Sequence, residues 1–558
     1  MRGLNSNAAM RAAMMAVIVL MALSGCTSAT EPLPDPESEE VEPITSDYNQ
    51  REHEELKVGG TLTTAINGIE SQHNQWHVEA GASTRELWGW YNPVTHIQGP
   101  SGEPEPNPDY FTSVRAKTID GSTQVTYTLN EAATFNDGTP IDWRALQSVW
   151  QVCGTVGRGC QADLGYQQIK SVEKGEDAKQ AVVTFHSVYP WWPGLFDRLL
   201  HPDAVDSFGT AYVGQAHPEW GAGPYKVQYI DGTADKASFV PNEKWWGDRG
   251  VLEERKFIPL GRGEEVTAFL AGKIDVARVN DGEQLERVQA AKGVEVRRGT
   301  NTAPRVLTLN GRRKPFDDPA VREALWLGTD RESLAGIAFH GLDHTEALPG
   351  SFVLLPHTEG YRDNFGAAVQ FDVRRARQML DGAGWTPGSD GIRERNGERL
   401  EIDLLVPRDD EAIAAAMRAY TSMMKDIGVE LRVHSRPRDE IDRAMGLRDF
   451  DMAFSFHPMR GTDAAANVCH MWCRDSAVNA SGVADPDVVD QITRQMLVET
   501  SREGQARIAN NAETKGFGQH GVMPLYLGPD IWATRSGLAN MGATAHAQPR
   551  IEDIGWQK

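Results

Sequence analysis

Short strand patterns alternate with amphipathic helix patterns along most of this 558-residue chain, and this alternation restricts the fold more than any other feature. The segment QVTYTL at 124–129 alternates apolar and polar residues, as a half-buried strand does. Asp142 is then placed to cap a helix that carries Trp143, Leu146 and Trp150 at helical spacing. Further strand patterns occur at 57–66, 180–186, 398–406 and 429–433, and further helix patterns at 264–272, 318–335, 371–382 and 411–427. This mixed order predicts an α/β chain with several lobes.

The first 26 residues have the features of an export signal. Two arginines supply positive charge, and the apolar run 12–23 is too short to span a bilayer as a stable helix. The segment LSGC at 23–26 resembles the bacterial lipobox, in which the cysteine thiol receives a diacylglycerol and cleavage occurs just before it. We therefore predict a lipoprotein signal peptide at 1–25 and lipidation of Cys26. The alternative is an ordinary secretory signal with a chance cysteine.

An acidic segment rich in proline, serine and threonine follows Cys26 and predicts a disordered tether at 26–56. The protein is therefore expected at the extracytoplasmic face of the cell membrane, held there by its lipid. The formal net charge is −22 and no basic tract is present, which argues against nucleic-acid binding. No later apolar run is long enough for a membrane helix.

The remaining four cysteines fall in two close pairs, Cys153 with Cys160 and Cys469 with Cys473. Four cysteines allow three pairings, and adjacency favours two local disulfides, which suit an oxidising compartment. The alternative for the second pair is a metal site that also uses His470. That spacing is unusual for zinc and no fourth ligand is near, so we expect no metal and no cofactor.

Several segments in a fixed order carry a family resemblance. They are ATFNDGTPIDWRALQSVW (133–150), GAGPYKVQYIDG (221–232), NEKWWG (242–247), TAFLAGKIDVA (267–277), LTLNGRRKPFDDPAVREALWLGTD (307–330) and ARQMLDGAGWTPGSDGIRERNGERLEIDLL (376–405). Together they resemble the peptide-binding family of ABC-importer substrate-binding proteins, which includes oligopeptide, dipeptide and nickel receptors, and most of all its actinobacterial lipoprotein branch. Most of these residues suit turns, caps and packing rather than ligand contact.

The resemblance implies a two-lobed periplasmic-binding-protein-like fold with an extra inserted domain and a hinge that closes around the ligand. The expected divisions are a first lobe at 57–90 plus 221–301 plus 523–558, an inserted domain at 91–220 and a second lobe at 302–522.

In peptide receptors of this family the ligand backbone lies between the lobes as an added strand, and its ammonium group meets an aspartate of the second lobe. The typical loop motif is absent here, so Asp463 is the candidate for that role, with a helix N-cap as the alternative. Arg460 could bind a carboxylate or phosphate, or be a solvated loop cation. Ser455, Phe456 and His457 occupy positions where ligand-facing residues are expected.

Two tryptophans complete the predicted ligand site. The Cys469–Cys473 loop would fix Trp472 at the cleft edge for stacking on a peptide side chain or a sugar, unless Trp472 belongs to the core. Trp76 lies in ESQHNQW (70–76), where the family usually has an Asp-Pro loop. Both loops depart from the usual pattern, which puts the substrate in doubt more than the fold.

No catalytic residue is expected, because the sequence lacks the Gly-x-Ser-x-Gly, P-loop and His-Glu-x-x-His motifs. The predicted function is capture of oligopeptides or dipeptides by lobe closure, for a membrane-embedded ABC permease, by a receptor expected to be a monomer. Nickel import is a second alternative, but the histidines are scattered and the sequence shows no cluster of metal ligands for it. A further alternative is the same scaffold acting as a glycolipid-binding or cell-envelope-assembly lipoprotein, which should have an apolar groove.

Overall fold

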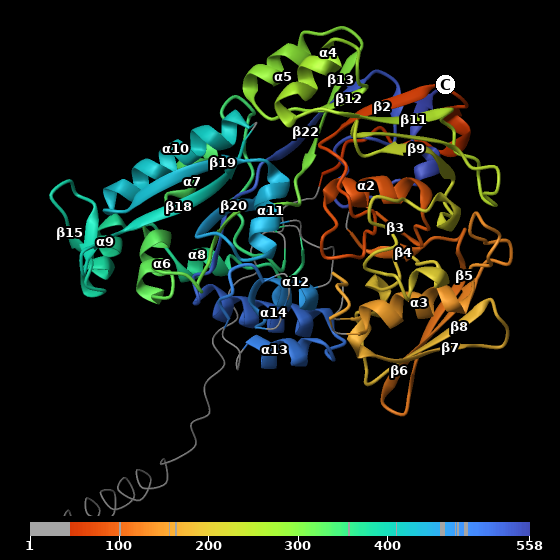
Figure 1. Ribbon diagram of the computed structural model, residues 1–558, viewed down its shortest axis with the longest axis horizontal. Helices are drawn as coiled ribbons and strands as arrows, with labels where there is room; N and C mark the ends of the chain where they lie inside the picture. The colour runs from red at the N-terminus through yellow and green to blue at the C-terminus, as the bar shows by residue number, and fades with distance from the viewer. Residues whose placement is uncertain are drawn as a thin grey trace, which may run out of the picture. The chain divides into compact units, whose positions relative to one another are not determined.

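The structure is a computed structural model that describes residues 45–99, 102–155, 157–161, 165–354, 356, 358–408, 410–457, 464–474, 476, 479–484 and 489–558 (Figure 1). All of them belong to the unit Val41–Lys558. The predicted signal peptide 1–25, Cys26 and the tether up to residue 44 lie outside the described residues. Within the described ranges, no helix is both long enough and apolar enough to cross a membrane.

Residues 45–56, predicted as the end of the tether, instead pack on the C-terminal part of the chain. Asp47 and Ala543 exchange backbone hydrogen bonds of 2.7 and 2.9 Å. Strand β1 (Leu56–Lys57) pairs with β24 (Gly555–Gln557), which also pairs with β23 (Leu538–Ala539). Residues 45–56 are therefore part of the fold and not of a tether, because backbone pairing offsets their lack of apolar residues.

A mixed four-stranded sheet joins segments far apart in the sequence. Its order is β2 (Thr61–Ile66), β11 (Glu254–Pro259), β10 (Lys236–Pro241) and β9 (Tyr225–Asp231), with β2 and β11 parallel and the other pairs antiparallel. The alternation in TLTTAI places Leu62 and Ile66 of β2 in a buried cluster, and Leu87, Trp90 and Tyr91 of helix α2 (Ala82–Tyr91) pack in the same cluster.

A second sheet consists of β12 (Val276–Arg278), β22 (Pro529–Arg535) and β13 (Val294–Thr300), all antiparallel. Helices α4 (Glu265–Leu270) and α5 (Gly282–Gln289) flank it (Figure 1). The central strand β22 comes from the C-terminal region, so this sheet forms only after two distant parts of the chain meet.

An antiparallel sheet lies within the predicted inserted domain. Its order is β5 (Phe111–Ile119), β6 (Ser122–Leu129), β8 (Gln180–Phe185) and β7 (Ile169–Lys174), and the small pair β3 (His96–Gln98) and β4 (Pro104–Pro106) precedes it. Helix α3 (Trp143–Cys153) packs on β7 and β8, and the predicted cap is confirmed because the Asp142 carboxylate accepts a 2.9 Å hydrogen bond from the Arg144 N–H. The sulfur atoms of Cys153 and Cys160 are bonded at 1.96 Å.

A five-stranded mixed sheet forms the other large α/β part. Its order is β19 (Glu430–Arg436), β18 (Glu401–Pro407), β20 (Met452–Phe456), β14 (Arg305–Leu309) and β21 (Val522–Tyr526). The helices of this part are α6 (Pro319–Leu327), α7 (Arg331–Ala338), α8 (Asn364–Ala368), α9 (Val373–Gly382), α10 (Glu411–Asp426), α11 (Arg438–Gly446), α12 (Ala464–Trp472), α13 (Val489–Met496) and α14 (Arg502–Phe517). Helices α7 and α10 lie against each other beside the sheet (Figure 1).

The single helix predicted at 318–335 is wrong, because two helices occupy this segment. Helix α6 ends at Leu327 with Gly328 as its C-cap. Asp330 then starts α7, since its carboxylate accepts a 3.0 Å hydrogen bond from the Ser333 N–H. The apolar spacing continues across the break, which is why periodicity alone merges the two helices.

The chain passes between the β12–β22–β13 sheet and the five-stranded sheet at two connections in the described residues. Residues 301–304 link β13 to β14, and residues 527–528 link β21 to β22. The predicted boundary at 301/302 falls in the first connection. The predicted boundary at 522/523 falls inside β21, so Met523–Tyr526 lie in the five-stranded sheet.

Candidate functional site

A pocket opens beside the two connections and draws its walls from both sheets. It measures about 520 Å³ when the space open to solvent is counted. Its lining residues are Arg278, Val279, Asn280, Asn301, Arg305, Ala338, Phe339, Leu342, Asp410, Ala412, Ile413, Tyr526, Pro529, Asp530 and Ile531. A pocket built from two α/β parts at their connections can change its volume when the parts move.

Arg305 is the first residue of β14 and one of the charged residues that line this pocket. Its guanidinium lies 5.0 Å from the ring centroid of Phe456 and 5.7 Å from that of Phe339. Desolvation lowers the pKa of Arg305, while Tyr526 and Asp410 oppose that shift. The guanidinium nevertheless stays charged at neutral pH, so the pocket holds a weakly hydrated cation.

Two more arginines surround the same region. Arg438, at the start of α11, stacks on Phe456 at 4.2 Å, so two guanidiniums contact one aromatic ring. Arg278, at the end of β12, lies 4.3 Å from the Trp532 ring centroid. Desolvation lowers the pKa of Arg438, and the positive charge of Arg278 lowers it further. Arg278 therefore affects both Arg305 and Arg438 electrostatically.

Acidic groups face the pocket as well. Asp530 lies 3.5 Å from Arg278 Nη1, and Asp410 caps α10 by accepting a 3.0 Å hydrogen bond from the Ile413 N–H. The pocket therefore carries both signs of charge.

Two of the three residues predicted at the end of β20 contact the surroundings of this pocket. Phe456 supplies the ring on which Arg305 and Arg438 stack. Ser455 is buried in β20, opposite Val306 of β14, and does not line the pocket. The His457 N–H donates a 3.0 Å hydrogen bond to the Pro304 carbonyl, at the first connection between the sheets. The end of β20 and the pocket are therefore parts of one site.

Trp472 belongs to the core rather than to the cleft edge. Only 1% of its surface is exposed, and its ring packs against Phe352 and Phe517. The sulfurs of Cys469 and Cys473 are bonded at 2.03 Å, so they are not available to a metal. A side chain this enclosed offers no face for stacking, and the disulfide stabilises the end of α12 instead.

Trp76 is also buried, with 5% of its surface exposed. Its ring meets Tyr166 edge to face at 6.1 Å, in the hydrophobic core that contains α3. The predicted binding residues Arg460 and Asp463 lie outside the described residues, and their roles stay predictions. Among the described residues, no group of three His, Cys, Asp or Glu side chains could hold a metal ion.

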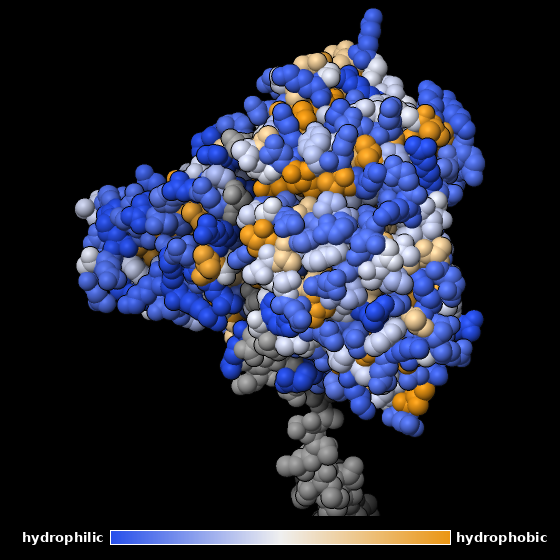
Figure 2. All heavy atoms as spheres, turned by 45° about the vertical axis from the view of Figure 1, so that its right-hand side comes forward, coloured by the Kyte–Doolittle hydropathy of each residue, from blue (hydrophilic) through white to orange (hydrophobic). Residues whose placement is uncertain are grey.

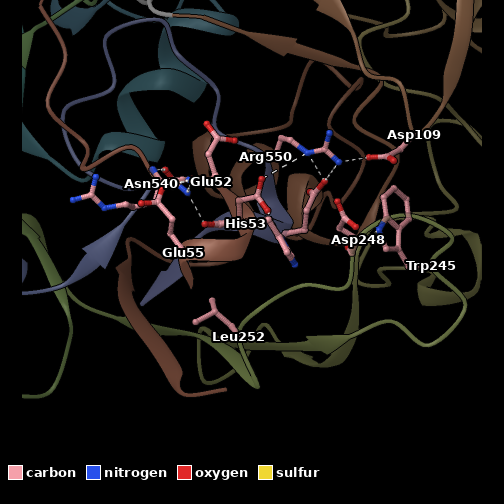
Figure 3. A network of polar contacts seen from close by, with 12 residues as sticks. Glu52, His53, Glu55, Asp109, Trp245, Asp248, Leu252, Asn540 and Arg550 are labelled. Carbon is pink, nitrogen blue, oxygen red and sulfur yellow. Dashed lines mark hydrogen bonds and ion pairs between the residues drawn. The ribbon is translucent and has the colours of Figure 1, made fainter. Parts of the chain in front are cut away.

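A second polar cluster, shown in Figure 3, connects the C-terminal segment to the predicted inserted domain. Arg550 lies 2.5 Å from Asp109 Oδ2 and 2.5 Å from Glu552 Oε1, and His53 Nδ1 lies 2.6 Å from Asp553 Oδ1. Burial raises the pKa of Glu552 to about 7, although the cation of Arg550 opposes this. Its charges pair with one another, so the cluster is a junction rather than a ligand site.

Sequence reasoning missed the arginines and Tyr526 that line the pocket. One signal was available: Arg305 opens the strand RVLTL, whose other four residues are buried. A cation at the start of a buried strand needs a partner or a cavity. Nothing in the sequence indicated that the start of this strand would share a pocket with residues of β12 and β22.

A pocket lined by charged groups, at the connections between two α/β parts, defines a class of protein: a two-lobed solute receptor of the periplasmic-binding type. The family model for bacterial extracellular solute-binding proteins, family 5 (middle region), matches residues 105–477, more than half of the chain. The chain belongs to this family, which is the peptide and nickel receptor family expected from its motifs. It is a solute-binding protein and not an enzyme.

Relatives extend over most of the chain. The oligopeptide-binding protein OppA of Mycobacterium tuberculosis is 29% identical over 97% of this chain and 93% of its own length. The probable monoacyl phosphatidylinositol tetramannoside-binding protein LpqW of M. tuberculosis is 26% identical over 64% of this chain and 60% of its own length. The oligopeptide-binding protein AppA from Bacillus subtilis, solved with a nonapeptide, superposes with a TM-score of 0.78 at 15% identity, covering 90% of this chain and 100% of that one.

Proposed function

We propose that this protein is a lipid-anchored receptor that captures oligopeptides outside the membrane and delivers them to a membrane-embedded ABC permease. The observation that carries the proposal is the pocket at the connections, where Arg305 lies with Asp410 and Asp530. A peptide carries an ammonium and a carboxylate group, so a pocket with both signs of charge suits it. The similarity to OppA over 97% of the chain supports the same assignment.

Capture would occur by closure at the two connections, 301–304 and 527–528. The lobe divisions given above fit this motion, with the second lobe extended to Tyr526. Affinity then comes from desolvating the ligand between the lobes and not from any chemical step. The receptor is expected to act as a monomer, and Asp463 and Arg460 would complete the site near His457.

The lipid anchor would be attached to Cys26. Two or three acyl chains, at about 0.8 kcal/mol per buried methylene, give stable membrane binding. Replacing Cys26 by serine should release the protein into the medium, and radiolabelled palmitate should no longer be incorporated. Palmitate incorporation into the Cys26→Ser protein would contradict the anchor assignment.

The alternative of a glycolipid-binding or envelope-assembly lipoprotein has support from the match to LpqW. It predicts an extended apolar groove. The pocket at the connections is lined by two arginines and two aspartates, and the face shown in Figure 2 is mostly hydrophilic with apolar residues in separate small patches. These features favour a polar ligand over a lipid.

Isothermal titration with alanine peptides of two to nine residues tests the proposal. Saturable one-to-one binding, with one preferred length, is the expected result. The neutral peptide N-acetyl-pentaalanine amide should bind much more weakly than pentaalanine. Binding of phosphatidylinositol mannoside in detergent, with no response to any peptide, would replace the peptide assignment by the envelope alternative.

A further inference from the structure

Arg305 has few partners for a cation held inside a pocket. Within the described ranges its guanidinium donates one hydrogen bond, from Nη1 to the Ala303 carbonyl at 3.3 Å, and no carboxylate lies within 4.0 Å of it. A guanidinium has five N–H groups, and desolvated ones are normally paired. The rings of Phe339 and Phe456 cover parts of the guanidinium without supplying an acceptor equivalent to a carboxylate.

The two aspartates of the pocket are engaged elsewhere. Asp530 accepts a 2.9 Å hydrogen bond from the Trp532 indole and faces Arg278 at 3.5 Å. Asp410 is the N-cap of α10 and accepts from the Ile413 N–H. Their negative charge lowers the cost of holding Arg305 in the pocket, but neither forms an ion pair with it in the described chain.

Tyr526 provides the second observation. This residue, at the end of β21, is 1% exposed and lines the same pocket. Its hydroxyl group has no hydrogen-bond partner among the described residues, although a buried hydroxyl without a partner costs about 1–3 kcal/mol. A donor and a cation therefore lie in one cavity, and each lacks the acceptor that would satisfy it.

We propose that Arg305 and Tyr526 form a subsite for a carboxylate group of the bound solute. One carboxylate has two oxygens and can accept from the guanidinium fork and from the phenol at the same time. Stacking on Phe456 fixes the plane of the guanidinium, which favours a planar acceptor over a spherical one. The subsite rests on the proposed function for its biological ligand, but its chemistry can be tested without a peptide.

The carboxylate could be the C-terminus of a peptide or an acidic side chain. Three pentapeptides separate these sources: pentaalanine, pentaalanine amide, and the amide with glutamate at the third position. A C-terminal subsite predicts that amidation weakens binding at least tenfold and that the central glutamate does not restore it. A side-chain subsite predicts that the glutamate peptide amide binds as well as pentaalanine or better.

N-acetylalanine tests the subsite independently of peptide capture, because it has a carboxylate and no ammonium group. Saturation-transfer NMR should detect its binding to the wild-type protein and should detect none for N-acetylalanine amide. Arg305→Met should weaken binding about tenfold or more, and Arg305→Lys should restore part of it, since lysine keeps the charge but not the fork. Arg436→Met, at an exposed position of β19, is the matched control and should change nothing.

Tyr526→Phe distinguishes a ligand role from a structural one. Removing a hydroxyl that has no partner should leave the melting temperature unchanged or raise it, while N-acetylalanine binding falls severalfold. Tyr420→Phe, at a buried tyrosine outside the pocket, is the control. Equal binding of N-acetylalanine by wild type, Arg305→Met and Tyr526→Phe, or no binding at all, would overturn the subsite. If N-acetylalanine binds through Arg305 but no peptide does, the subsite stands and the peptide function fails.

Discussion

Glu513 is a buried carboxyl group of α14, and its environment disfavours the ionised form. It accepts hydrogen bonds from the Phe352 N–H at 2.6 Å and from the Asn364 amide at 2.7 Å. Burial nevertheless raises its pKa to about 7, because the hydrogen bonds only partly replace lost hydration. The folded protein therefore holds a proton there that the unfolded chain releases at lower pH.

We predict that Glu513 makes a contribution to the free energy of unfolding that decreases between pH 5 and pH 8, while His96 and His520, whose pKa values burial lowers to about 4, contribute the opposite change. The pKa of Glu513 is higher in the folded state, so its stabilising contribution is complete below the unfolded pKa and is lost as the pH rises through about 7. The expected loss is about 1–3 kcal/mol. Urea unfolding of the wild type and of Glu513→Gln at four pH values measures it, since the variant lacks this contribution. An equally steep profile in the variant would contradict the assignment to Glu513; Glu552 contributes a further decrease.

Among the predicted ligand residues, the sequence indicated the surroundings of Phe456 and His457 better than those of Trp472. Phe456 contacts Arg305 of the pocket, and the His457 N–H donates to Pro304, while their expected contact with a ligand stays a prediction. For Trp472 the sequence left two alternatives, the core and the cleft edge, because an aromatic residue next to a cysteine is compatible with both. Its burial depends on Phe352 and Phe517, which are distant in the sequence, so no local pattern could decide it.

At the scale of elements, α12 and α14 approach closely where Trp472 meets Gly516. A Cβ atom on Gly516 would lie 2.3 Å from the Trp472 ring, so only glycine fits there. The indole cannot move away easily, because it is enclosed in the core and directly precedes the disulfide-bonded Cys473. This contact explains a glycine inside a helix, which otherwise costs stability.

Gly516→Ala should therefore destabilise the protein by about 1–3 kcal/mol through overpacking. Gly336→Ala is the matched control, because this glycine lies in α7 and its Cβ would meet nothing within 4 Å. That substitution should stabilise by about 0.5–1 kcal/mol through helix propensity. Thermal unfolding of both variants measures the difference, and a stabilising Gly516→Ala would show that α12 and α14 do not pack this way.

Most elements could be predicted from the sequence because their signals are local. The Asp142 cap of α3 and the alternation in β2, β6 and β18 are examples. The break between α6 and α7 was missed because its signals, Gly328 and Asp330, are short compared with the apolar spacing that spans them. The pairing of β12 and β13 with β22 was also beyond prediction, since register between distant strands leaves no local trace.

At the scale of the whole molecule, the predicted inserted domain and second lobe touch away from the two connections. The Trp191 indole donates a 3.0 Å hydrogen bond to the Met496 carbonyl, and Arg502 lies 2.8 Å from Glu103. The exposed ion pair contributes little. The indole hydrogen bond is partly buried, so it is the contact that should resist separation of the two parts.

We expect Trp191→Phe to speed ligand release about fivefold, because one hydrogen bond of about 1 kcal/mol is lost while an aromatic, though smaller, side chain is kept. The association rate should change little. Stopped-flow release of a fluorescent pentapeptide measures this, and Arg502→Gln is the control with a small expected effect. An unchanged release rate in Trp191→Phe would mean that this contact does not restrain opening.

The most direct test of the central claim is native mass spectrometry of residues 27–558, purified without denaturation so that any captured solute remains bound. A peptide receptor should give adducts with peptide masses that a defined mixture of short peptides displaces. These adducts should be lost in Arg305→Met. Adducts with lipid or mannose-bearing masses, or a protein that stays empty with every peptide offered, would contradict the claim that this is a peptide receptor.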